Sequence, residues 1–213
     1  GIPTYRGPNG IWEKYNFEEY ACEVAFQRNP NKVLKFHEIR RKSVETCNPH
    51  RGHKIISDIQ KRHTNVSIIT QNIDGIHQKS GSENVIELHG SLWRLRCPDE
   101  DIVKLEPSDI YESYICRCGA NLRPDIIWFG DALNIKTVDK AFALASYADL
   151  FISIGTSGEV WPAAGIPRIA KENGAFMIEI NPEDTESTYL FDEIVRKTSS
   201  TALIELFNDY NTL

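Results

Sequence analysis

The chain has 213 residues, 41% of them hydrophobic and 25% charged, which suits one globular α/β domain with a small insertion. A formal net charge of -6 without any basic run argues against a nucleic-acid partner, and no stretch is long and apolar enough to span a bilayer. The five cysteines lack the spacing of a disulfide framework and no signal-peptide pattern opens the chain, so we expect an intracellular, cytoplasmic protein, with mitochondrial and nuclear locations left open.

The amino-terminal quarter predicts a loop followed by helices. Residues 4–14 are polar and punctuated by glycine and proline, which is typical of a surface loop. From 16 to 47 the apolar residues recur at helical spacing, and Asn31 is a candidate N-cap for the helix that contains His37 and Arg40. These two residues are three positions apart and share one helix face, which the pattern alone predicts to be solvated and basic.

A helix and a strand then lead to a polar segment. Residues 52–62 have the pattern of an amphipathic helix, and residues 66–69 have the length and β-branched content of a buried parallel strand. Gln71, Asn72 and Asp74 follow directly, at the carboxyl end of that strand. By itself an Asn-x-Asp sequence after a strand is more often a turn or a helix cap than a site.

A second short strand is predicted over residues 85–88, and it ends at His89 and Gly90. In an open α/β sheet the carboxyl ends of parallel strands share one edge, and ligands bind there. We therefore expect the imidazole of His89 to converge with the amides and the carboxylate that follow the preceding strand. An imidazole is suited to accept a proton at neutral pH.

Further strands follow in the carboxyl-terminal half. They are predicted at 126–129, 150–154, 175–180 and 192–195, with a final helix near 202–207. Small residues come after the strand at 150–154, and Trp161-Pro162 opens a helix. Small residues at a helix start suit a ribose and phosphate groups.

Five separated segments resemble the sirtuins, the NAD-dependent protein deacylases, and they occur in the family's order. The segments are GIPTYR at 1–6, TQNIDGIH with ELHGS at 70–91, RPDIIWFGD at 123–131, GTS with the following Val, Pro and Ala at 155–163, and EIN at 179–181. The resemblance covers nearly the whole chain. Sirtuins also have a strand and a Gly-rich turn before the point at which this sequence begins, so we expect a longer chain.

The resemblance implies a doubly wound, Rossmann-like parallel sheet with a smaller helical and cysteine-ribbon lobe of the zinc type. The predicted NAD-binding domain comprises residues 1–14, 51–95 and 123–213. The predicted lobe comprises residues 15–50 and 96–122. NAD would be consumed as a co-substrate while an acyl group leaves a lysine of a protein or peptide, releasing nicotinamide and O-acyl-ADP-ribose. We expect a monomer that binds neither nucleic acid nor membrane.

The resemblance also assigns roles to individual residues. His89 is the expected general base, assisted by Asn72. NAD would be held by Tyr5, Arg6, Gln71, Asn72, Ile73, Asp74, Gly155, Thr156, Ser157 and Asn181. The acyl-lysine substrate would be bound by His37, Arg40, Ile127, Phe129, Gly130, Glu159 and Val160.

The acyl preference depends on the helix that contains His37 and Arg40. The desuccinylase branch of sirtuins (class III) has a Tyr-x-x-Arg pair there, which grips the carboxylate of succinyl- or malonyl-lysine. Arg40 matches the Arg, and His37 replaces the Tyr. We predict that an acidic acyl group is still accepted, with a pH dependence from His37. The rival prediction is that the shorter imidazole misses the carboxylate, so that other acyl groups, acetyl included, fit.

Cysteines occupy the segment that holds structural zinc in sirtuins. The family has two CxxC pairs, which supply four thiolates. Here Cys97 is followed by Glu100 where a second cysteine belongs, and Cys116 and Cys118 are one residue too close. A zinc site of these three thiolates, completed by Glu100, Asp99 or water, and an empty ribbon are both open.

Two other functions stay open beside the deacylase. One is a mono-ADP-ribosyltransferase, an activity associated with some sirtuin relatives, although an intact His89 and Arg40 count against it. The other is a module that binds NAD or acyl-lysine without turnover.

Overall fold

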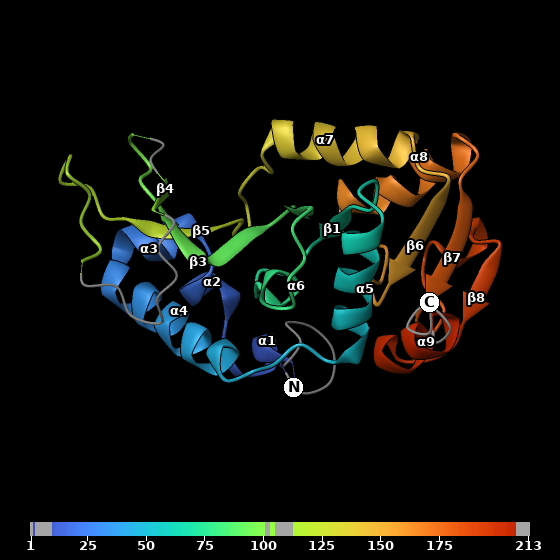
Figure 1. Cartoon of the computed structure of the whole chain (residues 1–213). Coiled ribbons are helices and arrows are strands. Elements are labelled where there is room, and N and C mark those ends of the chain that lie inside the picture. The colour runs from blue at the N-terminus through green and yellow to red at the C-terminus, as the bar shows by residue number, and fades with distance from the viewer. Residues whose placement is uncertain (1, 3–9, 101–102, 105–112, 208–213) are drawn as a thin grey trace. The chain divides into compact units, whose positions relative to one another are not determined.

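The computed structural model describes residue 2 and residues 10–100, 103–104 and 113–207 (Figure 1). The chain forms two compact units, each made of discontinuous segments. The first unit comprises Gly1–Asn48, Asn72–Gly75 and His89–Leu133, and the second comprises Pro49–Gln71, Ile76–Leu88 and Asn134–Leu213. The domain boundaries expected from the resemblance stay a prediction.

The second unit contains the parallel strands. Its elements are α5 (Arg51–Arg62), β1 (Ile68–Thr70), α6 (Ile76–Lys79), β2 (Val85–Glu87), α7 (Ile135–Ser146), β6 (Leu150–Ile154), η1 (Ala163–Gly165), α8 (Ile166–Glu172), β7 (Phe176–Ile180), η2 (Thr188–Leu190), β8 (Glu193–Val195) and α9 (Ser199–Leu206). Strand β1 pairs in parallel with β2, and β6, β7 and β8 form a parallel sheet in that order. The α/β architecture predicted from the sequence is confirmed.

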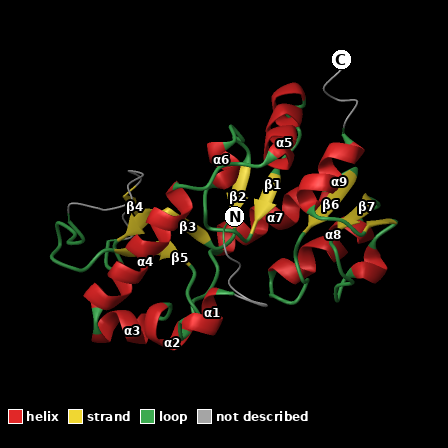
Figure 2. Ribbon diagram, turned by 90° about the horizontal axis from the view of Figure 1, so that it is seen from below, coloured by secondary structure: helices red, strands yellow, loops and turns green. Residues whose placement is uncertain are grey.

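Helices cover the three-stranded sheet of the second unit. Figure 2 shows α8 and α9 alongside β6 and β7. Ile55 of α5, Ile178 and Ile180 of β7, and Leu203 of α9 meet in one buried apolar cluster. Ile178 and Ile180 are two positions apart and so share one face of β7, and helical spacing places the apolar residues of α5 and α9 on one side of each helix.

The first unit is built from helices and an antiparallel sheet. Its elements are α1 (Ile11–Lys14), α2 (Phe17–Tyr20), α3 (Glu23–Arg28), α4 (Pro30–Glu45), β3 (Gly90–Arg96), β4 (Val103–Lys104) and β5 (Arg123–Ile126). The strand order is β4-β3-β5, and both pairings are antiparallel. Helix α4 packs against β3 and β5 (Figure 1). In the described part of the chain, no helix is long and apolar enough to cross a membrane.

Helix α4 begins earlier than predicted, so the N-cap expected at Asn31 is wrong. Asn29 is the N-cap, and its side chain accepts a hydrogen bond from the Lys32 backbone N–H at 3.0 Å. Pro30 occupies the first helical position. A backbone N–H at that position would have no acceptor within the helix, so its absence in proline costs nothing, and the fixed φ of proline already suits a helix. The proline therefore places the N-cap of α4 at the preceding residue, Asn29.

The strand predicted over residues 126–129 is also shifted, because β5 ends at Ile126 and runs antiparallel to β3. Residues 127–129 are held by irregular backbone bonds instead. The Ile127 N–H donates to the His89 carbonyl at 2.9 Å, and the Phe129 N–H donates to the Ala21 carbonyl at 3.1 Å. The apolar run reflects burial of Ile126 and Trp128 and not a continuous ladder.

Candidate functional site

The loop of Asn72, Ile73 and Asp74 is fixed to strand β3 by two hydrogen bonds. The Leu92 N–H donates to the Ile73 carbonyl at 2.9 Å, and the Trp93 indole N–H donates to the Asp74 carbonyl at 2.7 Å. Because the bonds use main-chain carbonyls, the loop is positioned by its backbone.

His89 lies where this framework meets the segment after β5. Its carbonyl accepts the Ile127 N–H, and its side chain is half-buried. The next residue, Gly90, has a φ of +77°, and an added Cβ would lie 2.0 Å from the Asp125 carbonyl oxygen. Only glycine permits this close approach of β3 to β5. The first unit thus holds the imidazole and the polar loop on one connected backbone framework.

Three other predicted residues converge within the second unit. Gln71 Nε2 donates to Thr156 Oγ1 at 3.2 Å, and Asn181 Nδ2 donates to the Thr156 carbonyl at 3.0 Å. These residues follow β1, β6 and β7, so the carboxyl ends of the parallel strands do carry polar groups that meet. Gly155 has a φ of +62°, and an added Cβ would meet nothing within 4 Å. That open backbone suits close approach of a ribose or a phosphate.

The remaining second-unit residues lie on the loop after Gly155. Ser157 and Glu159 are exposed and Val160 is half-buried. An added Cβ at Gly158, whose φ is +78°, would lie 2.3 Å from Ser187 Oγ. The loop is therefore held close to the chain that follows β7.

Sequence reasoning missed a buried carboxylate that supports Asn181. Glu179 is 2% exposed and accepts hydrogen bonds from Thr185 Oγ1 at 2.6 Å, Thr188 Oγ1 at 2.8 Å and Arg196 Nη1 at 2.8 Å. Arg196 Nη1 also donates to the Asn181 carbonyl at 3.2 Å. Burial acts to raise the pKa of Glu179, but the hydrogen bonds together lower it, so the carboxylate stays charged. A Glu inside an apolar strand was the available signal.

The basic face of α4 is buried, so the predicted solvated face is wrong. Exposure is 2% for His37, 7% for Arg40 and 0% for Arg41, because α4 packs this face on β3 and β5. Arg41 Nη2 donates to the Tyr114 hydroxyl at 2.6 Å, and that hydroxyl donates to Glu38 at 3.0 Å. The sequence pattern does not distinguish Arg41 from Arg40, so it could not predict that Arg41 is the more deeply buried of the two.

His37 is neutral at physiological pH in this environment. Its ring stacks on Trp128, with 6.0 Å between centroids and 20° between planes. Neither ring nitrogen makes a regular hydrogen bond within the described residues. Burial, followed by the charge of Arg41, lowers the pKa of His37 to about 3; an interaction with the Tyr20 backbone opposes this, and the charges of Arg40 and Arg123 add smaller lowering effects. The predicted titration of His37 near neutral pH is therefore wrong for the protein without substrate.

Arg123 is the third buried guanidinium and was not singled out as a site residue. It is 3% exposed and donates to Glu23 and Asp131, each at 2.6 Å. Its Cζ lies 3.6 Å from the centroid of the Trp128 ring, a cation–π contact. Burial lowers the pKa of Arg123, although its two carboxylate partners act to raise it.

The other residues expected to bind the acyl-lysine also belong to the first unit. Ile127 is half-buried, Phe129 is 39% exposed with its ring centroid 4.2 Å from that of Phe17, and Gly130 is exposed with a φ of +91°. Tyr5 and Arg6 lie outside the described residues.

The three cysteines predicted as metal ligands come together in the first unit. The donor atoms of Cys97, Glu100, Cys116 and Cys118 all lie within 4.8 Å of one another. Three thiolates and one carboxylate form a donor set that zinc accepts, so the cluster fits structural zinc.

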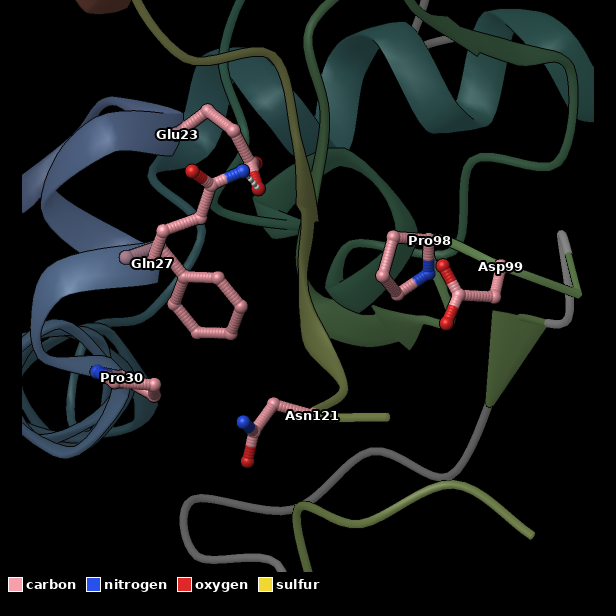
Figure 3. Close-up of a pocket in the computed structure, with 7 residues that line it drawn as sticks. Glu23, Gln27, Pro30, Pro98, Asp99 and Asn121 are labelled. Atoms are coloured by element: carbon pink, nitrogen blue, oxygen red, sulfur yellow. Dashed lines mark hydrogen bonds between the residues drawn. The ribbon is translucent and has the colours of Figure 1, made fainter. Parts of the chain in front are cut away.

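A separate hollow in the first unit contains none of the residues predicted to be catalytic or to bind NAD or the acyl-lysine, although Asp99, a candidate for completing the zinc site, lines it. It is lined by Glu23, Phe26, Gln27, Pro30, Pro98, Asp99 and Asn121 (Figure 3). Gln27 Nε2 donates to Glu23 at 3.3 Å across its wall. The hollow belongs to neither the His89 framework nor the Thr156 cluster.

Comparison with known proteins shows what the chain resembles. The sequence pattern of the Sir2 family matches residues 1–162. An NAD-dependent protein deacylase of Aquifex aeolicus (strain VF5) is 41% identical over 211 residues, which are 98% of this chain and 88% of that protein. Two solved structures, a mutant Sir2 homologue with ADP-ribose and a Sir2 homologue with NAD, are each 36% identical over 100% of this chain. Their TM-scores are 0.92 and 0.89, over 86% and 84% of those chains.

Proposed function

The chain belongs to the Sir2 family and is an NAD-dependent protein deacylase, and we propose that it removes succinyl or malonyl groups from protein lysines in preference to acetyl groups. The observation that carries this preference is the burial of two guanidiniums, Arg40 and Arg41, on the helix face that also contains His37. Burial is the largest cause of the lowered pKa of His37, and the charges of Arg41, Arg40 and Arg123 act in the same direction and favour an anion.

The charges around His37 support a carboxylate ligand. Among the acids of this region, Glu23 and Asp131 accept from Arg123, and Glu38 accepts from Tyr114. Arg40 and Arg41 bring two further buried positive charges to the same helix face. An acyl carboxylate would offer the Arg40 guanidinium a bidentate, charge-assisted pair.

We further propose that neutral His37 contributes a hydrogen bond to the acyl carboxylate and no charge. Both nitrogens are buried, and apart from the interaction with the Tyr20 backbone neither makes a regular hydrogen bond among the described residues; one of them carries a proton in the neutral ring. This replaces the donor that a Tyr hydroxyl supplies in the desuccinylase branch. Phe129 and Ile127 would contact the apolar part of the acyl-lysine.

His89 and the loop of Asn72 and Asp74 are proposed to carry the chemistry. NAD, when bound, supplies the ribose that accepts the acyl group as nicotinamide is released. His89 would take a proton from a ribose hydroxyl, Asn72 would orient a hydroxyl or a water, and the Asp74 carboxylate would accept from the nicotinamide amide. Support comes from Gly90, which leaves no side chain beside His89, and from the two bonds that fix the loop to β3.

We propose that Gln71, Thr156 and Asn181 bind NAD, Gln71 near the nicotinamide ribose and Thr156 and Asn181 on the adenosine side, with Gly155 giving the backbone access. Their mutual hydrogen bonds support one preorganised cluster. None of the five cysteines forms a disulfide, which supports a reducing, intracellular compartment. A monomeric state and the lack of a nucleic-acid partner stay predictions.

The test compares matched succinyl-lysine and acetyl-lysine peptides with NAD, followed by mass spectrometry. We expect faster removal of the succinyl group, and we expect Arg40→Met to lose that preference by tenfold or more while acetyl turnover persists. Lys42→Met is the matched control, because Lys42 is an exposed cation on the same helix. An Arg40→Met enzyme with the parent's preference would contradict the carboxylate grip while leaving the deacylase itself intact.

A further inference from the structure

The cysteine cluster of the first unit contains a carboxylate where its family resemblance leads one to expect a fourth thiolate. Cys97 directly follows β3, and Glu100 lies in the turn three residues later. Cys116 and Cys118 come from a second turn. The Sγ atoms of Cys97 and Cys118 are 3.6 Å apart, and Cys116 Sγ is 3.5 Å from Glu100 Oε2.

These two distances match the edges of a zinc tetrahedron. With Zn–S bonds of about 2.3 Å and Zn–O bonds of about 2.1 Å, ideal tetrahedral angles separate two sulfurs by about 3.8 Å and a sulfur from an oxygen by about 3.6 Å. All four donor atoms are close enough to surround one ion, since no two of them are more than 4.8 Å apart. The carboxylate therefore occupies the position of a ligand, not of a neighbour beyond the ligands.

Glu100 is held in this position by Arg117. The Arg117 Nε donates to the Oε2 of Glu100 at 3.0 Å, the same oxygen that faces Cys116. A zinc ion with three thiolates and one carboxylate has a net charge of about -2, so a guanidinium at the carboxylate stabilises the charged set. Arg117 is exposed and lies between Cys116 and Cys118 in the sequence.

The other candidates for a fourth ligand fit less well. Asp99 lines the hollow shown in Figure 3, together with Pro98 and Asn121, and is not among the four converging donors. A water would leave the Glu100 carboxylate, whose side chain is 30% exposed, beside three thiolates, with Arg117 as its ion-pair partner among the described residues.

We propose that Glu100 is the fourth ligand of a structural zinc site with Cys97, Cys116 and Cys118, and that Arg117 positions its carboxylate. This proposal does not depend on the acyl preference, because metal content and spectra test it without any activity measurement. Its consequence is a site that releases zinc more readily than four thiolates would, since a carboxylate is a weaker and harder ligand than a thiolate.

The experiment uses the whole protein and measures zinc per chain by mass spectrometry, the rate of zinc transfer to a chromogenic chelator, and the absorption of the cobalt-substituted form. We expect one zinc per chain in the parent. Glu100→Gln should lose zinc at least tenfold faster, and Arg117→Gln should do so by a smaller factor. Asp99→Asn, the adjacent acid, is the matched control and should behave as the parent does.

A second variant, which adds a thiolate ligand, keeps the proposal testable if Glu100→Gln does not fold. Glu100→Cys should hold zinc more tightly than the parent, and its cobalt form should show stronger thiolate-to-metal charge-transfer absorption, because four sulfurs replace three. Unchanged zinc release and an unchanged cobalt spectrum in Glu100→Gln would overturn the proposal. A parent protein without zinc after purification in zinc-supplemented buffer would overturn it as well.

Discussion

Acidification should destabilise this protein through His37, and the effect can be isolated by substitution. The pKa of His37 in the folded protein is about 3, whereas an unfolded histidine titrates near 6.5. A depressed folded pKa means that the unfolded chain binds the proton first. The stability contribution is therefore fully present above pH 6.5 and is lost as the pH falls from 6.5 towards 3.

The magnitude follows from the distance between the two pKa values. At pH 5 the unfolded histidine is protonated and the folded one is not, and a difference of about 1.5 pH units from 6.5 corresponds to about 2 kcal/mol. His37 is fully buried, so solvent screening does not reduce this figure. The full loss near pH 3 would approach about 5 kcal/mol, a large share of the stability of a typical domain.

The assay is urea unfolding at pH 7 and pH 5, followed by tryptophan fluorescence, for the parent and for His37→Leu. The parent should lose about 2 kcal/mol more between the two pH values than the variant does, whatever the variant's stability at pH 7. His63→Gln, at an exposed histidine, should show the parent's pH dependence. Equal losses in the parent and His37→Leu would mean that His37 accepts a proton in the folded state without cost, and would refute the reasoning.

Two further substitutions test the frameworks of the two units. Gly90→Ala should lower the free energy of unfolding by about 3 kcal/mol, because the new Cβ meets a β5 carbonyl at 2.0 Å and φ is positive; Gly174→Ala, with a similar φ but open space, should cost only about 1 kcal/mol in the same melting experiment. Glu179→Gln should raise KM for NAD several-fold with little change in kcat, since it weakens the Arg196 contact that supports the predicted adenosine site. Exposed Glu193→Gln is its control, and a fall in kcat at constant KM would point to a different role.

Several features were set by the sequence because they depend on local pattern. Strand β6 was predicted at 150–154 and lies at Leu150–Ile154, and helix α5 was predicted within one residue of its observed start. An apolar β-branched run and an apolar helical stripe each have one favourable way to be buried. The polar residues after β1 and β6 follow from the same reasoning, since the ends of parallel strands share an edge.

Other features were decided only by tertiary structure, because they depend on residues far apart in the sequence. The charge state of His37 depends first on its burial, to which the Trp128 ring contributes, and then on neighbouring charges that include Arg123; the partner of Arg41 is Tyr114, 73 residues away. No periodicity in α4 distinguishes a solvated basic face from one packed on a sheet. The same holds for Glu100, whose ligand position follows from where two turns meet. Burial and electrostatic field are properties of the packed chain, and they determine the chemistry that these side chains can perform.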